Sequence, residues 1–597
     1  MKMKKTLPLP DRPFWEIRQD DFLYADKTEY IYRILNVDKY KTCFLSRPRR
    51  FGKTLLLSTI AALFTRERDL FEGLWISNSD YKFEKHPVLN FNMGFSKTGT
   101  PEELITRIND TLTMMADTHG IRLKSNAYGE MLGELLAGLH GKHGKHGQGA
   151  VILVDEYDAP VIDHISDRDL ALENRNVLHN FYRSMKANIC YIHLAFVTGI
   201  TGFVMSSLDS GPNNLWDISL KPEYAGICGF TPGELVTCFE DRFPETIRSL
   251  QDQGVLGQND DFEELIALIK KYYDGYNWLG SENVLNPYSI LCFFEQQKLG
   301  SYWPKTGRPS HLTALVRENP LDFILPQLDG YPIDEVLISD ITNLSAIPVL
   351  FHSGYLTIDR QRVMMTKSNG FEMTDDVLSF RFPNREVAIA YNKTIFKDVF
   401  KPNRNYLSNM TKELPNALAQ KDSDAVEKLL RNLLTSISYL EHPTASQLAP
   451  YETFAESWQN PASEKYAVSE EPNSTERYYH AILHGSFLSA GFDVHSQGAG
   501  AHGRNDIALF LNDKFRVVIE LKYCALRMLT DKGGKSGNES KMKERLEKVI
   551  EEALDRAENQ MRRKDYAGPY RAAGCRVTCM AVAIWDRDKV AVRFLEN

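Results

Sequence analysis

The tripeptide Gly52-Lys53-Thr54 separates two segments of different pattern, and this position constrains the fold of the first half of the chain. Before it, the apolar run Cys43–Leu45 is typical of a buried strand, and after it Leu55–Phe64 has the apolar spacing of a helix. A turn from strand to helix leaves backbone N–H groups at a helix N-terminus, where anionic oxygens bind. The segment therefore predicts a phosphate-binding turn at the edge of a sheet.

The residues around this tripeptide fit the pattern G-x-x-x-x-G-K-[ST], except that Arg47 replaces the first glycine. In such a loop the glycine lets the backbone approach the ligand, Lys53 reaches the β- and γ-phosphates of ATP, and the Thr54 hydroxyl ligates Mg²⁺. For Arg49 and Arg50, contact with phosphate and exposure to solvent both stay open. The predicted nucleotide-binding residues of the loop are Arg49, Arg50, Phe51, Gly52, Lys53, Thr54 and Leu55.

A second apolar run, Val151–Val154, ends in the carboxylates Asp155 and Glu156. Ligands of open α/β sheets bind at the carboxyl ends of strands, so both carboxylates are expected beside the phosphate-binding turn. We expect Asp155 to hold Mg²⁺, directly or through water, and Glu156 to polarise the attacking water as general base. In isolation, an ordinary strand end with acidic caps has the same appearance. The two motifs together, in this order, favour an ATPase.

Two further apolar runs, Val88–Phe91 and Ile192–Val197, alternate with helical patterns such as Leu170–Lys186. Strands that alternate with helices predict an α/β fold with a parallel sheet and helices on both faces. Thr198 follows the last run and is the candidate for a polar contact with the γ-phosphate. A plain strand terminus is the alternative reading of that residue.

A second constellation lies near the C-terminus, where Asp506 precedes the strand-like segment that contains Glu520 and Lys522. Side chains alternate along a strand, so Glu520 and Lys522 share one face. Carboxylates there would bind Mg²⁺ or Mn²⁺ and the lysine would orient or activate water, as phosphodiester hydrolysis requires. Glu476, on the preceding helix, is a third candidate metal ligand. Alone, Glu-x-Lys on a strand is more often an edge salt bridge, and the upstream turn Gly503–Asp506 favours a site.

The patterns divide the chain into four parts. Residues 1–235 are α/β, residues 236–400 look mostly helical, and residues 401–470 combine helix with a polar, proline-containing stretch. Residues 471–597 contain a helix, several strands and a second long helix, which predicts another α/β domain.

Charge and cysteine usage limit the classes of partner and compartment. The chain has 71 Lys and Arg against 79 Asp and Glu, whereas residues 471–597 have 21 against 18. DNA would therefore contact the C-terminal part, although a solvated basic surface explains so small an excess equally well. The eight cysteines form no CxxC pair, which argues against a zinc ribbon and a disulfide scaffold. Since neither a signal peptide nor a long apolar run occurs, we expect a cytoplasmic protein with no membrane contact.

Several stretches together resemble one family. They are Tyr24–Thr28, Arg47–Thr54, Val154–Asp158, Thr198-Gly199, Tyr273–Tyr276, Asn286-Pro287, Ser353–Leu356 and Pro383–Val387. Over nearly its whole length the chain looks like the bacterial AAA-ATPase-like proteins that carry a PD-(D/E)XK nuclease domain, in which an arginine at the first glycine position is normal. The resemblance implies an AAA-related ATPase core in residues 1–235, a lid or accessory part in 236–400, a helical linker in 401–470, and a restriction-endonuclease-like domain in 471–597.

The resemblance has consequences for individual residues as well. Gln560, followed by Tyr566, matches a Q-x(n)-Y element of the family and is a candidate catalytic, site-lining residue. Many relatives carry a glutamate where this chain has Gln497, and that departure would weaken metal binding. AAA-like sites are often completed by an arginine of a neighbouring subunit, which would make the protein a homo-oligomer, but the sequence does not identify that arginine.

Three functions fit these motifs. The first is an ATPase coupled to a Mg²⁺-dependent nuclease that acts on DNA, and the second is an ATP-regulated switch or assembly protein whose nuclease-like domain only binds nucleic acid or a partner protein. The third is a small-molecule kinase. Asp506, Glu520 and Lys522 favour cutting, and the pair Asp155-Glu156 favours attack by water over transfer to an acceptor. The sequence does not distinguish DNA from RNA, or gating by ATP from driving by ATP.

Overall fold

The structure, a computed structural model, describes most of the chain. The residues that it describes fall in two compact units, one within residues 4–388 and one within residues 389–596. The described ranges are 4–37, 41–66, 68–94, 100–143, 149–165, 167–202, 215–303, 330–337, 345–368, 371–395, 404–436, 474–490, 492–496, 507–512, 514–524, 539–586 and 589–596.

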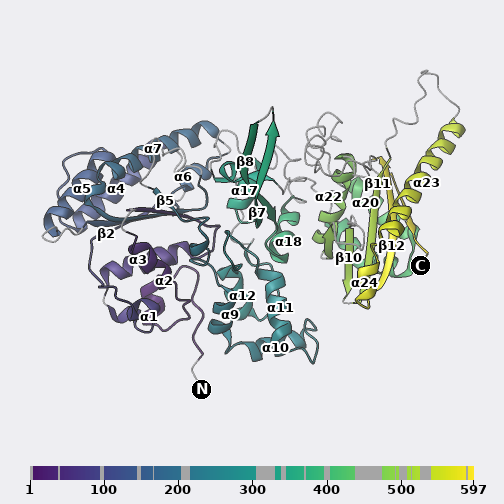
Figure 1. The fold of residues 1–597 in the computed structure, drawn as a ribbon, viewed down its shortest axis with the longest axis horizontal. Helices are drawn as coiled ribbons and strands as arrows, with labels where there is room; N and C mark the ends of the chain where they lie inside the picture. Colours follow the sequence, from purple (N-terminus) through teal and green to yellow (C-terminus); the bar gives the residue numbers. More distant parts are fainter. Residues whose placement is uncertain are drawn as a thin grey trace. The chain divides into compact units, whose positions relative to one another are not determined.

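The first unit contains a five-stranded sheet in the order β2-β3-β4-β1-β5 (Figure 1). Its strands are β1 (Thr42–Ser46), β2 (Val88–Asn92), β3 (Ala150–Asp155), β4 (Ile192–Gly199) and β5 (Leu215–Asp217). Every neighbouring pair is parallel, which confirms the predicted α/β fold. Because β4 lies between β1 and β3, the carboxyl ends of the three strands that carry the sequence motifs are adjacent.

Helices cover both faces of this sheet (Figure 1). On one face lie α4 (Pro101–Thr118), α5 (Tyr128–His143) and α7 (Arg168–Ala187). On the other, α3 (Lys53–Thr65) packs on β2, β3 and β4. The short helices α1 (Phe14–Gln19) and α2 (Thr28–Leu35) lie on the same side as α3. The phosphate-binding turn therefore leads directly from the inner strand β1 into a helix packed on the sheet.

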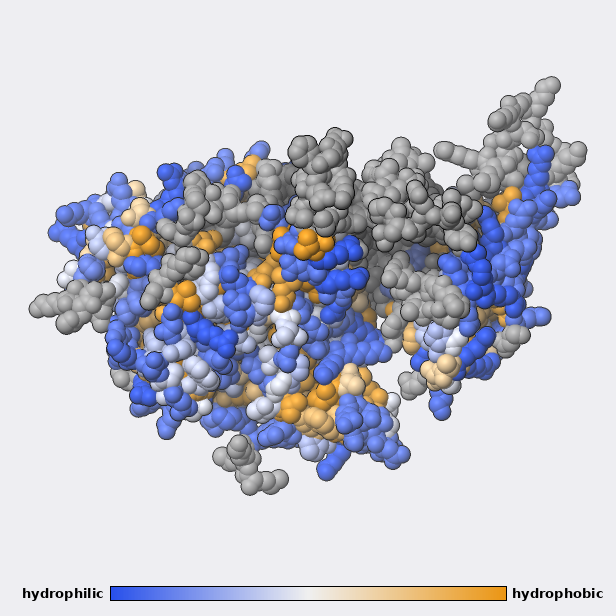
Figure 2. Space-filling model, in the orientation of Figure 1, coloured by the Kyte–Doolittle hydropathy of each residue, from blue (hydrophilic) through white to orange (hydrophobic). Residues whose placement is uncertain are grey.

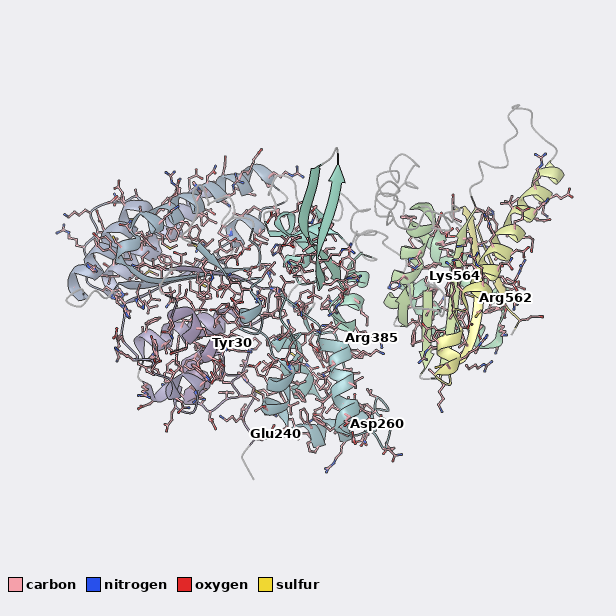
Figure 3. The ribbon with its side chains drawn as sticks, viewed as in Figure 1. Tyr30, Glu240, Asp260, Arg385, Arg562 and Lys564 are labelled. Carbon is pink, nitrogen blue, oxygen red and sulfur yellow. The ribbon has the colours of Figure 1, made fainter. Side chains whose placement is uncertain are left out.

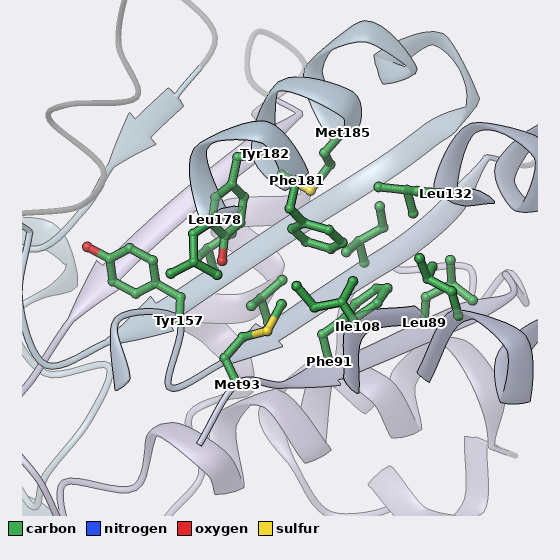
Figure 4. Close-up of a cluster of buried hydrophobic side chains, with 14 of the residues drawn as sticks. Leu89, Phe91, Met93, Ile108, Leu132, Tyr157, Leu178, Phe181, Tyr182 and Met185 are labelled. Atoms are coloured by element: carbon green, nitrogen blue, oxygen red, sulfur yellow. The ribbon is translucent and has the colours of Figure 1, made fainter. Parts of the chain in front are cut away.

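A buried apolar cluster joins the sheet to α4, α5 and α7 (Figure 4). Leu89 and Phe91 of β2 meet Ile108, Leu132 and Phe181 of the three helices there. Burial of such side chains stabilises the fold by about 1.5–3 kcal/mol each. Tyr157, just beyond β3, is fully buried in the same cluster, so the core fixes the acidic strand end.

The middle of the chain is largely helical, as predicted. Its longer helices are α9 (Pro232–Phe239), α10 (Phe243–Asp252), α11 (Phe262–Tyr273), α12 (Pro287–Gln296), α17 (Ala346–His352) and α18 (Arg385–Ile395). Thr231 with Glu234, and Asp261 with Glu264, form capping boxes that satisfy the first backbone N–H groups of α9 and α11. The face shown in Figure 2 is mostly hydrophilic, but hydrophobic side chains gather near α10 and α11, where Phe262 is 41% exposed.

A small sheet in this middle region was not predicted. It has the order β6-β8-β7, with β6 (Tyr331–Pro332), β7 (Thr357–Ser368) and β8 (Phe371–Arg381). The register of β7 and β8 shifts between Ile358 and Arg360, and β7 mixes charged with apolar residues. An irregularity of this kind interrupts the alternation by which strands are identified in a sequence.

The second unit has a mixed five-stranded sheet in the order β13-β12-β11-β10-β9, consistent with the predicted C-terminal α/β domain. The strands are β9 (Asp493–Ser496), β10 (Ile507–Asn512), β11 (Phe515–Tyr523), β12 (Arg576–Asp586) and β13 (Lys589–Phe594). Only β11 and β12 pair in parallel, and α23 (Glu539–Lys564) and α24 (Gly568–Ala572) lie between them in the sequence. Parallel neighbours need such a crossover.

Helices complete the second unit. Leu554, Ala557 and Met561 of α23 lie three or four residues apart and are buried, with Ala553, against β11 and β12. The last turn of α23 is basic, with Arg562 and Lys564 labelled in Figure 3. The helices α19 (Arg404–Gln420) and α20 (Ser423–Ser436) lie within the range predicted as a linker, and α20 packs on β13. No helix in the described ranges is long and apolar enough to cross a membrane.

Candidate functional sites

The phosphate-binding turn has the backbone of a tight loop. Gly52 has φ +92°, in the left-handed region, and α3 begins at the next residue. A side chain at Gly52 would be strained in this conformation although nothing lies within 4 Å of its position. The requirement for glycine is therefore conformational, and it places Lys53 and Thr54 in the first turn of α3.

Lys53 is folded back along the loop. Its side chain is almost fully buried, and Nζ donates hydrogen bonds to the carbonyl oxygens of Arg47 and Pro48, each at 3.0 Å. Burial lowers the pKa of Lys53, and the carboxylates of Asp155 and Asp158 oppose that shift. The loop thus holds a lysine close to where backbone N–H groups of a helix start attract anions.

Thr54 connects the two motifs of the first site. Its Oγ1 donates a hydrogen bond to Asp155 Oδ2 at 2.6 Å, across 101 residues of sequence. The other oxygen of Asp155 accepts the backbone N–H of Glu156 at 3.0 Å. A hydroxyl and a carboxylate are hard oxygen donors of the kind that Mg²⁺ binds, so this pair fits the predicted magnesium site.

Glu156 has a left-handed backbone, with φ 49°, which is uncommon for a residue with a side chain. Its carboxylate lies against Gly94, because a Cβ built on Gly94 would be 1.7 Å from Glu156 Oε2. Burial raises the pKa of Glu156, and the neighbouring Asp155 adds to the rise. A strained, solvent-accessible carboxylate with a raised pKa at a strand end is suited to proton abstraction.

Thr198 lies between the two motifs, as the strand order requires. Its Oγ1 donates a hydrogen bond to the carbonyl oxygen of Leu45 in β1 at 2.8 Å, and its own carbonyl accepts the N–H of Tyr157 at 3.1 Å. In this structure the Thr198 hydroxyl ties β4 to β1. Contact with a γ-phosphate remains a prediction.

Asp158 has a structural role that the sequence did not suggest. It is 1% exposed and accepts hydrogen bonds from the N–H groups of Ile200 and Thr201 and from the Thr201 hydroxyl, the last two at 2.7 Å. Burial raises the pKa of Asp158 and these hydrogen bonds oppose the rise. The only sequence signal was its place in the stretch Val154–Asp158.

Gly199→Ala should destabilise the first unit. A Cβ at Gly199 would lie 2.4 Å from Tyr157 Cδ1 and 2.5 Å from Asp158 Oδ1, and both neighbours are buried. Overpacking at such a position costs about 1–3 kcal/mol. Chemical denaturation measures the loss. The control, Gly141→Ala, adds a methyl group to an exposed helical position with nothing within 4 Å and should stabilise slightly. Equal stabilities of the two variants would contradict this expectation.

Arg47 explains how the loop tolerates an arginine at its first glycine position. The side chain is fully buried and points out of the loop, where it donates to the carbonyl oxygens of Ser219 at 2.8 Å and Tyr224 at 3.3 Å. Its guanidinium carbon lies 4.2 Å from the centre of the Trp278 ring. Burial lowers the pKa of Arg47 to about 10. Sequence reasoning did not find these partners, which lie more than 170 residues away.

The other predicted residues of the loop face different surroundings. Arg49 lies 3.9 Å from Asp163, and Arg50 lies 3.4 Å from Asp11, with partly exposed side chains in both cases. Phe51 is buried, whereas Leu55 is partly buried in the first turn of α3. Contact of the two arginines with phosphate stays a prediction, and Phe51 is a packing residue of the loop.

The second site brings together three of its predicted residues. Lys522 Nζ lies 3.2 Å from Glu476 Oε1 and 3.2 Å from Glu520 Oε1. Glu520 is fully buried and Glu476 is 6% exposed. The other oxygen of Glu476 accepts the N–H of Tyr523 at 2.9 Å, which joins the start of α22 (Ser474–Ser489) to the end of β11. One lysine thus lies between two enclosed carboxylates.

The other residues predicted for the second site are Asp506, Gln497 and Gln560. Asp506 and Gln497 lie outside the described residues. Asp506 directly precedes Ile507 in the sequence, and Ile507 pairs with Ile519, the neighbour of Glu520. Gln560 Nε2, in α23, donates to the hydroxyl of Tyr566, just beyond that helix, at 3.1 Å, so the two residues of the predicted Q-x(n)-Y element are in contact. Among the described side chains, no group of three or more His, Cys, Asp or Glu residues forms a metal cage.

Comparison with known proteins places both sites within family matches. Residues 11–209 match the AAA-ATPase-like family, described as predicted AAA-ATPases, and residues 474–593 match the PD-(D/E)XK nuclease superfamily. A protein of Azotobacter chroococcum mcd 1, described as an uncharacterized protein in the vnfD 5' region, is 29% identical over 540 residues. That similarity covers 89% of this chain and 93% of the other protein, so it extends beyond the two matched domains.

Proposed function

Because the chain carries an AAA-ATPase-like domain at residues 11–209 and a PD-(D/E)XK nuclease domain at residues 474–593, we propose that it hydrolyses MgATP at the first site and cuts DNA at the second. The observation that carries the first half is the hydrogen bond between Thr54 and Asp155. It joins a helix-starting phosphate loop to an acidic strand end, the two parts that ATP hydrolysis needs.

At the first site, backbone N–H groups at the start of α3 and the Lys53 ammonium would bind the phosphates. Thr54 and Asp155 would hold Mg²⁺, which neutralises charge on the phosphate oxygens. Glu156 would accept the proton of the attacking water, since its raised pKa brings the carboxylate nearer to the pKa values useful for proton transfer at neutral pH. The pair of acids favours water over a small-molecule acceptor, and so favours an ATPase over a kinase.

At the second site, Glu476 and Glu520, together with Asp506, are the proposed ligands for Mg²⁺ or Mn²⁺. Such an ion stabilises phosphodiester charge and lowers the pKa of water. Lys522, 3.2 Å from both carboxylates, would orient the attacking water. The lysine also balances two buried negative charges, and a buried charge needs such a partner. Gln560 is proposed to line the same site.

We propose that this chemistry takes place in the cytoplasm. All eight cysteines are free thiols, which fits a protein that works in the reducing cytoplasm. If a neighbouring subunit supplies an arginine to the ATP site, the active form is a homo-oligomer. Light scattering with and without ATP tests that part directly.

The test of the whole proposal is cleavage of single- and double-stranded DNA and RNA by the full chain, with and without ATP and with Mg²⁺, Mn²⁺ or EDTA. We expect metal-dependent cleavage of DNA that EDTA abolishes, and release of phosphate from ATP without any acceptor. Nucleic acid that binds but is never cut would favour an ATP-regulated binding protein. A strict requirement for a small-molecule acceptor would refute the ATPase assignment.

A further inference from the structure

The phosphate loop is held from outside by the middle region of the first unit. Phe51 packs edge-on against Tyr276 and Trp278, with ring centres 4.7 and 5.2 Å apart. Pro48 lies so close to Gly354 that a Cβ on Gly354 would be 2.8 Å from Pro48 Cβ. The same region supplies Trp278 to Arg47. The loop conformation therefore depends on residues far along the chain, and not only on its own glycine.

The contact with the most direct effect on the loop backbone comes from Trp303. This side chain is fully buried, and its Nε1 donates a hydrogen bond to the carbonyl oxygen of Arg49 at 3.2 Å. A trans peptide is planar, so the Arg49 carbonyl and the Arg50 N–H point in opposite directions. The hydrogen bond directs the Arg49 carbonyl toward Trp303, so the Arg50 N–H points away from Trp303. In a phosphate-binding turn, N–H groups turned inward are the ones that bind anions.

Trp303 is in turn fixed by a buried carboxylate. Glu386 is 2% exposed, and its Oε1 accepts the backbone N–H groups of Tyr302 and Trp303, the latter at 2.9 Å. Its Oε2 accepts the Ser289 hydroxyl of α12 at 2.7 Å. Hydrogen bonds to a charged acceptor are stronger than neutral ones, so this carboxylate sets the position of the 302–303 backbone firmly.

Glu386 itself belongs to the first turn of α18 (Arg385–Ile395). Asn384 caps that helix by accepting the N–H of Val387 at 3.0 Å. The guanidinium of Arg385, labelled in Figure 3, lies 5.2 Å from the centre of the Tyr272 ring of α11. The start of α18 is thus anchored on both sides of the glutamate. Since Glu386 is the second residue of the helix, this anchoring fixes the carboxylate against Trp303.

We propose that Trp303 and Glu386 are positioning residues of the ATP site. Trp303 orients the peptide between Arg49 and Arg50 for phosphate binding, and Glu386 orients Trp303. This inference rests on the proposed ATP binding and extends it, because it gives a role to the stretch Pro383–Val387, which begins 329 residues after Thr54. It also makes the middle region part of the nucleotide site.

The first variant that tests the proposal is Trp303→Phe, which keeps a buried aromatic ring, removes the N–H donor and leaves a smaller side chain. We expect the Kd for MgATP, measured by calorimetry on the full chain, to rise about 2- to 10-fold, the effect of one lost hydrogen bond. Trp75→Phe is the control, because Trp75 is 40% exposed and its ring packs against Tyr32, which does not belong to the phosphate loop. It should bind MgATP as the natural protein does.

A pair of substitutions at Glu386 adds a second readout. Glutamine can accept the two backbone N–H groups through its oxygen and donate its amide to the Ser289 oxygen, so Glu386→Gln should keep the Kd within about 3-fold. Glu386→Ala removes the acceptor for all three donors and should weaken MgATP binding about 10-fold or more. A purely structural role would lower the melting temperature of the alanine variant and leave the Kd of folded protein unchanged.

The outcomes separate this inference from the proposed function. Absence of MgATP binding by the natural protein would remove the ATP site itself. Normal binding by the natural protein and equal binding by Trp303→Phe would overturn the positioning role alone. If Glu386→Ala does not fold, the comparison of Trp303→Phe with Trp75→Phe still decides.

Discussion

Glu156→Gln is expected to slow ATP hydrolysis about 10²- to 10⁴-fold and to leave MgATP bound. The substitution preserves the size and most of the shape of a side chain that lies against Gly94, so the loop and the strand end should keep their geometry. Lys53 and Thr54, the residues proposed to bind phosphate and Mg²⁺, are unchanged. What is lost is the ability to accept a proton from water.

Phosphate release at saturating ATP measures the rate, and equilibrium binding of labelled ATP measures retention. Glu173→Gln is a suitable control, since Glu173 is an exposed glutamate of α7 and its substitution should change neither quantity. Hydrolysis by Glu156→Gln at the natural rate would remove Glu156 from its role and leave Asp155 as the remaining carboxylate of the strand end. Loss of binding together with hydrolysis would show that Glu156 supports the loop instead.

The fold of the first unit could be predicted because local patterns determine it. The apolar runs that end at Leu45, Val154 and Val197 are short, rich in branched and aromatic residues, and followed by polar residues, as buried parallel strands are. Parallel strands also require their functional residues to lie at the carboxyl ends. The structure accordingly brings Thr54 within 2.6 Å of Asp155 although nothing local connects them.

Contacts between distant residues were not predictable in the same way. Arg47 looked like a substitution within a loop, but its side chain is held in place by hydrogen bonds to Ser219 and Tyr224 and by the ring of Trp278. Glu386 looked like part of a family motif and has a buried role at Trp303. A single sequence contains no signal that pairs such residues, because each partner is set by how the elements pack and not by spacing along the chain.

The second site could be predicted from the sequence only in part. Alternation along β11 was enough to place Glu520 and Lys522 on one face, and the structure has them 3.2 Å apart. The approach of Glu476 depends on how α22 meets the end of β11, where the Tyr523 N–H binds its carboxylate. The spacing of residues along a strand is thus predictable from the sequence, whereas the approach of a helix to its end requires the fold.

Lys522→Ala is expected to reduce metal-dependent DNA cleavage about 10²- to 10⁴-fold, the range for loss of a group that activates water. The exposed residue Lys514, in the turn before β11, offers the matched control Lys514→Ala, which should cleave normally. ATP hydrolysis should be unchanged in both variants because the ATP site belongs to the other compact unit. Cleavage by Lys522→Ala at the natural rate would refute the assignment of this site.

A loss of cleavage by Lys522→Ala has a second physical explanation, which is destabilisation of the second unit. The variant Glu520→Gln distinguishes this explanation from loss of a catalytic group. Without the lysine, the carboxylates of Glu476 and Glu520 are left almost fully buried with less positive charge nearby, and such a change can destabilise a domain by about 3–5 kcal/mol. Glu520→Gln removes one negative charge instead and keeps the packing of a fully buried side chain. If the site is catalytic, Glu520→Gln also abolishes cleavage while thermal unfolding of the second unit stays cooperative. If the cluster only stabilises the fold, Glu520→Gln cleaves normally, because the neutral amide relieves the charge that Lys522 balances.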